Sequence, residues 1–331
     1  REKEINDSAN ADFLYKDYLN FKHWLAQYGI TAKLTPTLMN QWGTPDGGMA
    51  AFQWILSPVI NWNAFHSDEI GQGSFQFSYT YNRYGNSQNG TSLTARLKAI
   101  TAVNDTPFHD YTFNQLTYTH VFPGRLVQFS VGQFPISNFD SNQYAANQQV
   151  NFVNYITGNR IQFSTVGKGQ YAIFGYAQWK PVINGLGTAQ YSLLYYQQPK
   201  VPAQMDASQG WSLNLVQNLN KDWGLFFRAN TATGAIAPIA TSVAGGFVLN
   251  NPFGGTRGDQ WGVGAAWNKT NKAYFPFTTV RDGEFVAETY LNIVVSHVLQ
   301  LGPSVQIIFN PALQPQASTA GVFTLRATGL F

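Results

Sequence analysis

The sequence has little charge, no cysteine and no long apolar run, and each of these absences excludes a class of protein. Charged residues make up 11% of the 331 residues, against roughly 25% in an ordinary soluble domain. Without cysteine, disulfide scaffolds, thiolate zinc sites and cysteine nucleophiles are excluded. No run of about 18 apolar residues occurs, which excludes a membrane-spanning helix. A net charge of +3 is too small to indicate a nucleic-acid partner.

Aromatic residues, in contrast, are abundant. They form 15% of the chain, together with 30 glycines and many Asn, Gln and Thr residues. This composition suits strands that meet an apolar medium on one side and water on the other. It predicts an all-β fold, a transmembrane antiparallel up-and-down β-barrel, in which no sheet edge is left unpaired in lipid. A soluble β-sandwich, whose strands also alternate, is the alternative.

The first 29 residues differ from the rest of the chain. Between Asp12 and Tyr28, apolar residues recur every three or four positions, and Gly29 follows, which predicts one short amphipathic helix. No basic and apolar secretory segment precedes this helix, so we take the chain as a mature form. We therefore expect an N-terminal segment over 1–29 and a single transmembrane β-barrel domain over 30–331.

From Ile30 onward the period of the apolar residues falls to two, in segments of about ten residues divided by Gly, Pro, Asn and Asp. In the clearest segment, Phe285 and Leu291 belong to one face, and Glu288 and Tyr290 belong to the other. We count sixteen such segments, near 30–42, 50–64, 73–84, 91–103, 113–122, 125–136, 159–165, 171–180, 187–198, 209–219, 223–231, 243–252, 259–269, 285–299, 304–311 and 321–331.

The order of turns and loops leaves fourteen strands as an alternative. Short turns and long loops must lie on opposite rims of such a barrel, and we expect Phe331 at the periplasmic rim and 270–284 outside. If 91–103 and 159–165 both cross the membrane, the long polar segment 137–158 falls on the periplasmic side. Treating both segments as parts of infolded loops removes the conflict. Sixteen strands is our prediction, and fourteen remains open.

Several short stretches follow one another in a characteristic order. They are Leu25-Ala-Gln-Tyr-Gly-Ile30, Val131-Gly-Gln-Phe-Pro135, Asn138-Phe-Asp140, Asn251-Pro-Phe-Gly-Gly-Thr-Arg-Gly-Asp259, Glu288-Thr-Tyr290, Leu301-Gly-Pro-Ser-Val-Gln306 and Asn310-Pro311. With the barrel pattern, they resemble the carbohydrate-selective porins of the OprB type over nearly the whole chain. The resemblance implies a sixteen-stranded outer-membrane barrel with an inward-folded third loop, a narrow eyelet and sugar uptake.

No catalytic or metal-binding constellation is visible in the sequence. The five histidines form no metal-spaced pair, and no G-x-S-x-G, G-x-G-x-x-G or P-loop motif occurs. We therefore expect no enzyme activity, no cofactor and no metal. A barrel hydrolase is a remote alternative, with His120 as its nearest candidate residue.

Charges are so few that each one in the lumen should shape the electric field there. Arg96 and Lys98 share one face of the segment 92–99. They should line the lumen if this segment is a strand, or the eyelet if it is an infolded loop, and rim charges are the alternative. Every second residue of a barrel strand faces the lumen. This alternation predicts four further lumen residues, Arg228, Glu288, Tyr290 and Arg326.

The third-loop candidate, 137–159, is rich in amides and aromatic rings. Amides hydrogen-bond to sugar hydroxyls and flat rings stack on sugar faces, although a loop that only braces the barrel wall would explain the same composition. The solute-lining residues predicted in it are Asp140, Asn142, Tyr144 and Gln148.

These observations predict a passive channel, integral to the bacterial outer membrane, that passes small carbohydrates through a narrow polar eyelet. A general or mildly anion-preferring porin is the first alternative, because the net charge is +3 and arginines point inward. A structural or adhesive barrel is less favoured, since the inward residues are mostly polar. The expected partners are small sugars and outer-membrane lipid, with no nucleic acid, and homo-oligomerisation is left open.

Overall fold

A computed structural model describes residues 13–44, 50–104, 110–124, 127–133, 142–144, 149, 173–200, 206–255, 257–314, 316 and 318–331. Its elements are α2 (Phe13–Gln27), β1 (Ile30–Thr44), β2 (Ala50–Ser67), β3 (Gly71–Tyr84), α3 (Gly90–Arg96), β4 (Asp110–Val121), β5 (Gln128–Gln133), β6 (Ile173–Trp179), β7 (Val182–Ile183), β8 (Gly187–Gln198), β9 (Ser208–Asn218), β10 (Trp223–Thr231), β11 (Ile239–Asn250), β12 (Gln260–Thr270), η3 (Lys272–Tyr274), β13 (Gly283–Ser296), β14 (Leu299–Phe309) and β15 (Thr319–Gly329). Among the helices in these ranges, none has the length and apolar character needed to cross a membrane.

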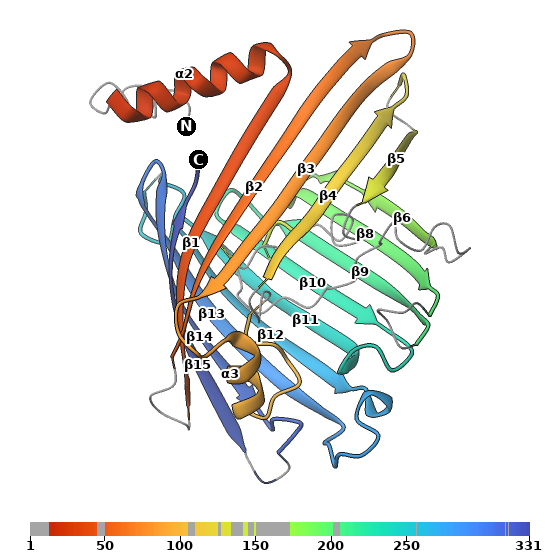
Figure 1. Ribbon diagram of the computed structural model, residues 1–331, viewed down its shortest axis with the longest axis vertical. Coiled ribbons are helices and arrows are strands. Elements are labelled where there is room, and N and C mark those ends of the chain that lie inside the picture. The colour runs from red at the N-terminus through yellow and green to blue at the C-terminus, as the bar shows by residue number, and fades with distance from the viewer. Residues whose placement is uncertain are drawn as a thin grey trace.

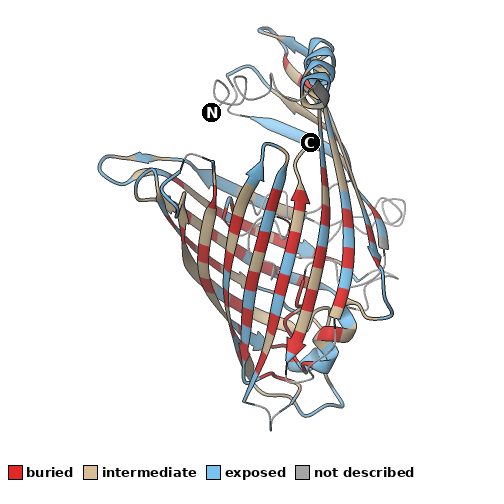
Figure 2. Ribbon diagram, turned by 90° about the vertical axis from the view of Figure 1, so that its left-hand side faces the viewer, coloured by how far each residue is buried: buried red, intermediate tan, exposed pale blue. Residues whose placement is uncertain are grey.

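The strands form one antiparallel sheet that curls around an interior (Figures 1 and 2). Hydrogen-bonded neighbours follow the order β5-β4-β3-β2-β1-β15-β14-β13-β12-β11-β10-β9-β8-β6, so the first strand pairs with the last. Both β6 and the two-residue β7 pair with β8. The described residues therefore supply fourteen positions along the sheet. The strand predicted at 159–165 lies outside them, so the choice between fourteen and sixteen strands stays open.

Alternation of the side chains gives the sheet one buried and one exposed face, which Figure 2 shows as bands along the strands. In β13, Glu288 and Tyr290 are buried, whereas Phe285 is exposed. The faces predicted for this segment are thus confirmed. Aromatic rings meet one another on the outer face, and β12 carries Trp261 near one end and Trp267 near the other. Two such levels of aromatic residues are typical of membrane barrels.

The strand predicted at 91–103 is wrong, because α3 and irregular chain occupy this segment. Asn89 caps the helix: its Oδ1 accepts a hydrogen bond from the Ser92 backbone N–H at 2.8 Å, and Ser92 Oγ accepts one from the Asn89 N–H at 2.8 Å. Such a reciprocal capping box stabilises a helix start. Leu93 and Leu97, which suggested a period of two, are also one helical turn apart, and both are buried.

The N-terminal helix is confirmed as α2, which ends at Gln27, and Gly29 follows it with a φ of 73°, which suits a glycine after a helix. The Tyr15 ring stacks on His297 with centroids 5.5 Å apart, and the Tyr18 ring meets Phe331 edge-on at 5.9 Å. Helix α2 therefore lies at the rim where the chain ends, with α3 at the other end of the strands (Figure 1). That residues 1–29 form a unit distinct from the barrel domain remains a prediction.

Three short turns lie at the rim that carries α2, together with the nine-residue connection 251–259, and other long connections lie at the opposite rim. The turns are 68–70, 219–222 and 297–298, and the loops include 85–109, 199–207 and 271–282. Apart from 251–259, this is the separation that the order of turns and loops predicted. We refer to these two ends as the turn rim and the loop rim.

We expect the loop rim to face the outside of the cell. Phe277 in the 271–282 loop is 99% exposed, and the chain has no native cysteine. A Phe277→Cys variant should therefore react on intact cells with a maleimide that is too large to pass the barrel. A matched Asp68→Cys variant, in an exposed turn of the turn rim, should react only after the cells are permeabilised. The opposite labelling pattern would reverse the orientation.

Candidate functional site

The buried face of the sheet is lined with amides and hydroxyls. Many of them bond to one another across strands, as in the contact from Gln53 Nε2 to Asn82 Oδ1 at 2.6 Å. The buried polar residues on the strands include Gln41, Gln53, Asn82, Ser192, Asn214, Asn268, Ser304, Gln306, Thr324 and Thr328. The interior is thus polar with few charges, the inverse of a soluble protein core.

Three charged residues predicted to face the interior lie on this face. Arg228 in β10, Glu288 in β13 and Arg326 in β15 are all at least 95% buried. The guanidinium of Arg326 lies against Gly302 of the neighbouring strand, where Nε donates to the Gly302 carbonyl oxygen at 3.4 Å. A Cβ atom on Gly302 would come within 2.9 Å of that Nε. Glycine here lets a long cationic side chain lie flat along the wall.

The predicted residue Tyr290 follows the same rule. Its ring lies over Gly262, where a Cβ atom would overlap ring carbons. Its hydroxyl donates to Gln260 Oε1 at 2.6 Å. Arg326 and Tyr290 are therefore each packed along the wall against a glycine of a neighbouring strand.

Two described parts of the long 134–172 connection, residues 142–144 and Gln149, contact the buried face of the sheet, and we refer to them together as the crossing segment. At one end, Asn142 Nδ2 donates to Asn214 Oδ1 at 3.4 Å, and both Tyr144 Oη and Gln143 Nε2 donate to Asn218 Oδ1, the latter at 3.1 Å. All of these acceptors belong to β9. Tyr144 is buried, with its ring against Gly224 and in a cluster with Val216 and Phe226.

At its other end, this crossing segment reaches the first and last strands. Gln149 Nε2 donates to the Thr35 carbonyl oxygen at 3.0 Å and to Thr37 Oγ1 at 2.8 Å, and its own carbonyl oxygen accepts from Thr328 Oγ1 at 2.8 Å. Strands β9 and β1 are seven positions apart in the sheet. Residues 142–144 and Gln149 of one connection therefore contact strands that lie far apart around the sheet.

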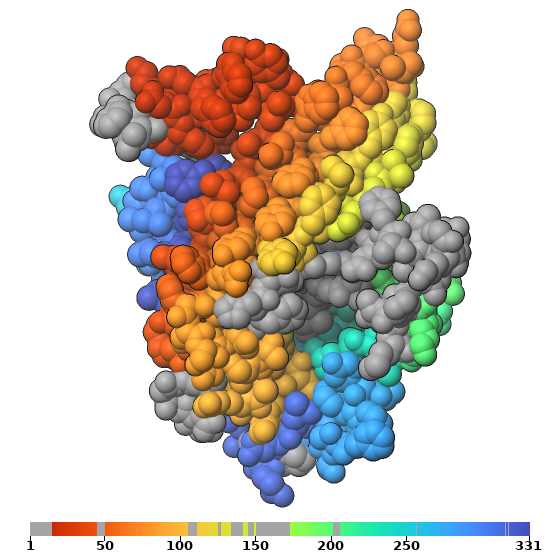
Figure 3. All heavy atoms as spheres, viewed as in Figure 1, coloured from red at the N-terminus to blue at the C-terminus, as the bar shows by residue number. Residues whose placement is uncertain are grey.

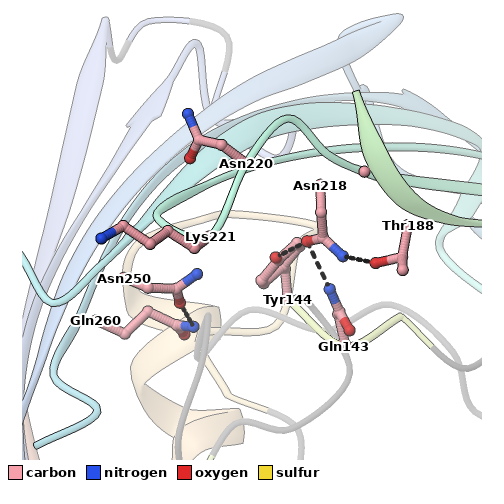
Figure 4. Close-up of a pocket in the computed structure, with 9 residues that line it drawn as sticks. Gln143, Tyr144, Thr188, Asn218, Asn220, Lys221, Asn250 and Gln260 are labelled. Carbon is pink, nitrogen blue, oxygen red and sulfur yellow. Dashed lines mark hydrogen bonds between the residues drawn. The ribbon is translucent and has the colours of Figure 1, made fainter. Parts of the chain in front are cut away.

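A polar cavity of about 480 Å³ lies where the crossing segment meets β9 (Figure 4). Asn218 is central to it, since its Oδ1 accepts from the crossing segment while its Nδ2 donates to Thr188 Oγ1 at 2.7 Å. Among the described residues that line it, Lys221 carries the only charge. The lining residues are Gln143, Tyr144, Gly187, Thr188, Asn218, Asn220, Lys221, Asn250 and Gln260.

A second segment, 89–104, folds against the buried face near the loop rim. Leu93, Leu97, Ala99 and Val103 from this segment form one apolar cluster with wall residues Ala51, Tyr84, Val286, Ile308, Ala320 and Val322. In Figure 3 the atoms of this segment fill the lower part of the molecule beside the last loops of the chain. Arg96 and Lys98 are exposed on this infolded segment and do not belong to a wall strand.

The predicted solute residues do not form one group. Arg96 and Lys98 lie toward the loop rim, where the Lys98 carbonyl oxygen accepts from the Leu313 N–H at 2.9 Å. Asn142 and Tyr144 contact β9, and Tyr144 does so at its turn-rim end. The wall residues Arg228, Glu288, Tyr290 and Arg326 lie on strands β10, β13 and β15, between the rims. The remaining two predicted residues, Asp140 and Gln148, lie outside the described residues.

Sequence reasoning missed residues that hold the infolded segments, above all Glu284 and Asn218, whereas Gln149 belongs to the amide-rich loop that the sequence singled out. Glu284 lies four positions before Glu288 and therefore shares its face of the strand. It could have been assigned to the buried face, but the predicted strand began one residue later, at Phe285. Asn218 carries no local signal, because its partner in the crossing segment lies far away in the sequence.

Two carboxylates at the loop rim, Asp206 and Asp282, have pKa values below the ordinary value. Asp206 accepts the Ala235 and Ala207 N–H groups at 3.0 and 2.9 Å, which holds its pKa below the ordinary value. The Lys272 ammonium lies 2.6 Å from Asp282 and lowers the pKa of that carboxyl in the same direction. The described residues contain no group of three or more His, Asp or Glu side chains placed to hold a metal ion.

Known proteins resemble this chain in both sequence and fold. The family model described as "Carbohydrate-selective porin, OprB family" matches residues 164–331. Porin AaxA of Chlamydia pneumoniae is 31% identical over 316 residues, which are 84% of this chain and 72% of the relative. Porin AaxA of Chlamydia trachomatis serovar D is 29% identical, over 90% of this chain and 77% of the relative. The high-pH structure of OprB from Pseudomonas putida matches with a TM-score of 0.73 at 15% identity, covering 95% of this chain and 97% of that one.

Proposed function

Since this chain belongs to the OprB family of carbohydrate-selective porins, integral β-barrel proteins of the bacterial outer membrane, we propose that it passes small neutral sugars by passive diffusion. The polar cavity at the crossing segment is the observation that supports this solute class most directly. Its amides and hydroxyls donate and accept hydrogen bonds, while Lys221 is the one charge among its described lining residues. A neutral polyhydroxylated solute can exchange its water contacts for such groups without needing a counter-charge.

The strength of these contacts is compatible with transport. A hydrogen bond of this kind contributes about 1 kcal/mol net. A solute that makes two or three such bonds is held briefly and then released, as conduction requires. Tight binding would stop the flow, so a weak, multi-site polar path is the arrangement that a passive sugar channel needs.

A mildly anion-preferring general porin is the second candidate. It is favoured by the two arginines buried on the inner face, Arg228 and Arg326. Against a strong preference, Glu288 lies on the same face within electrostatic reach of Arg326. The wall therefore carries mixed charge rather than an uninterrupted basic strip.

Liposome swelling separates the two candidates. Vesicles that contain the purified protein should swell faster in a neutral monosaccharide than in a sugar acid or an amino sugar of similar size. The expected reason is that a charged solute loses hydration in a polar but nearly uncharged passage. Faster entry of the sugar acid would support the anion-preferring porin and overturn the sugar proposal.

Arg96 is the residue of the basic pair that we expect to contact solute. Its planar guanidinium offers five donors and stacks well, so lysine is a poor substitute. An Arg96→Ala channel should show several-fold weaker block of ion current by sugar, and Arg96→Lys should restore little of it. Arg326→Ala should mainly alter ion preference and serves as the control. Unchanged sugar block in Arg96→Ala would make this residue a rim charge.

A further inference from the structure

Glu284, the second residue of β13, holds two loops that are far apart in the sequence. Its side chain is only 1% exposed. Oε1 accepts the Thr101 N–H at 2.7 Å, and Oε2 accepts the N–H groups of Ile100 and Ala312 at 3.0 Å each. One carboxylate of the wall thus binds three backbone amides, two from the infolded segment 89–104 and one from the loop 310–318.

Side chains of other wall strands also bind the segment 89–104. Gln41 Nε2 and Gln306 Nε2 both donate to the Val103 carbonyl oxygen, at 3.0 and 3.2 Å. Asn268 Nδ2 donates to Thr101 Oγ1 at 2.8 Å. Strands β1, β12, β13 and β14 therefore all contribute polar anchors, in addition to the apolar cluster around Leu93 and Leu97.

The Glu284 carboxylate and the segment 89–104 stabilise each other. A buried charge is costly unless it is hydrogen-bonded, and bonds from N–H groups to a carboxylate are roughly twice as strong as neutral ones. In return, the amides of Ile100, Thr101 and Ala312 would be left without this acceptor if the carboxylate were removed. Among the polar anchors named here, Glu284 is the charged one. We expect it to contribute more than each of the others to holding the segment 89–104 in place.

We propose that Glu284 is the positioning residue of a second constriction, formed by the segment 89–104 near the loop rim. This constriction limits solute size independently of the crossing segment. Its exposed residues Arg96 and Lys98 depend on Glu284 for their position. The inference rests on the chain being a porin and does not depend on the class of solute.

Two substitutions and a reversible tether test this proposal. In planar bilayers, Glu284→Ala should raise single-channel conductance at least two-fold and admit larger polyethylene glycols, and Glu284→Gln, which keeps one carbonyl acceptor, should lie between it and wild type. A Cβ atom at Gly43 would lie 3.7 Å from Leu93 Cγ, the place that the sulfur of a cysteine at position 93 would occupy, so we expect cysteines at these two positions to form a disulfide. In Glu284→Ala carrying Gly43→Cys and Leu93→Cys, oxidation should restore the wild-type size limit, and a reductant should remove it again.

The matched control is Glu288→Gln, which removes a buried carboxylate from the same strand and face. It should shift ion preference and leave the polymer size limit unchanged. A Glu284→Ala channel with wild-type conductance and size limit would overturn the proposal, as would an enlarged channel that the disulfide does not narrow. If Glu284→Ala does not assemble, Glu284→Gln decides: a wild-type size limit in that variant would overturn the proposal. Polymer exclusion is read without sugar, so failure here is distinct from failure of the sugar proposal.

Discussion

A Gly210→Val variant will lose the compact band that the wild-type protein shows on SDS gels before heating. Barrel strands satisfy one another's backbone groups and therefore resist mild SDS until heated. Gly210 lies on the buried face of β9, and a Cβ atom there would overlap the Thr231 carbonyl oxygen and come within 2.9 Å of the Tyr196 ring. Because a backbone oxygen cannot move aside, we expect a cost of about 3 kcal/mol or more, at the upper end of overpacking.

Gly175 in β6 provides the matched control, since a Cβ atom there would have no neighbour within 4 Å. Valine favours strands, so Gly175→Val should keep both the compact band and the wild-type urea midpoint. The two measurements together separate a steric effect from a general effect of losing glycine. An intact compact band for Gly210→Val would show that β9 and β10 are not packed as described.

The second large effect is expected when the crossing segment is released from both walls. An Asn218→Ala and Gln149→Ala double variant loses four side-chain hydrogen bonds between the segment and strands β9 and β1. At about 1 kcal/mol each, they sum to about 4 kcal/mol, enough to free a short segment. Single-channel conductance should rise several-fold with noisier open levels, and sugar block should fall.

Gln300→Ala is the control for this experiment. Gln300 is also a buried amide, but its Oε1 accepts from Asn292 within the wall and not from the crossing segment. Its removal should leave conductance and sugar block near the wild-type values. If the double variant conducts like wild type and is blocked equally by sugar, the crossing segment does not narrow the channel.

Features of the fold that depend on neighbouring residues could be predicted from the sequence, and features that depend on distant contacts could not. The strand faces could be predicted because alternation of residues such as Phe285 and Glu288 is a local pattern that follows from strand geometry. The segment around Leu93 and Leu97 could not, because its spacing fits a strand and a helix equally well. The capping box at Asn89 and the packing of Leu93 and Leu97 against apolar wall residues favour the helix.

The site divides in the same way. Tyr144 and Asn142 could be proposed because the composition of their loop is unusual, and Arg326 and Tyr290 because their strands alternate; a role in solute passage remains a prediction for all four. Glu284 could not be connected to Thr101, 183 positions away, since no local rule links them. That Arg326 and Tyr290 lie flat on Gly302 and Gly262 follows from the register between strands, which a single sequence does not disclose.

In mechanical terms, residues 142–144 and Gln149 are two attachment points of one connection on distant parts of the wall. Residues 142–144 bond to β9, and Gln149 bonds to β1 and β15. Moving β9 away from β1 would strain both sets of hydrogen bonds. We therefore expect the two attachment points to oppose widening of the sheet between these strands.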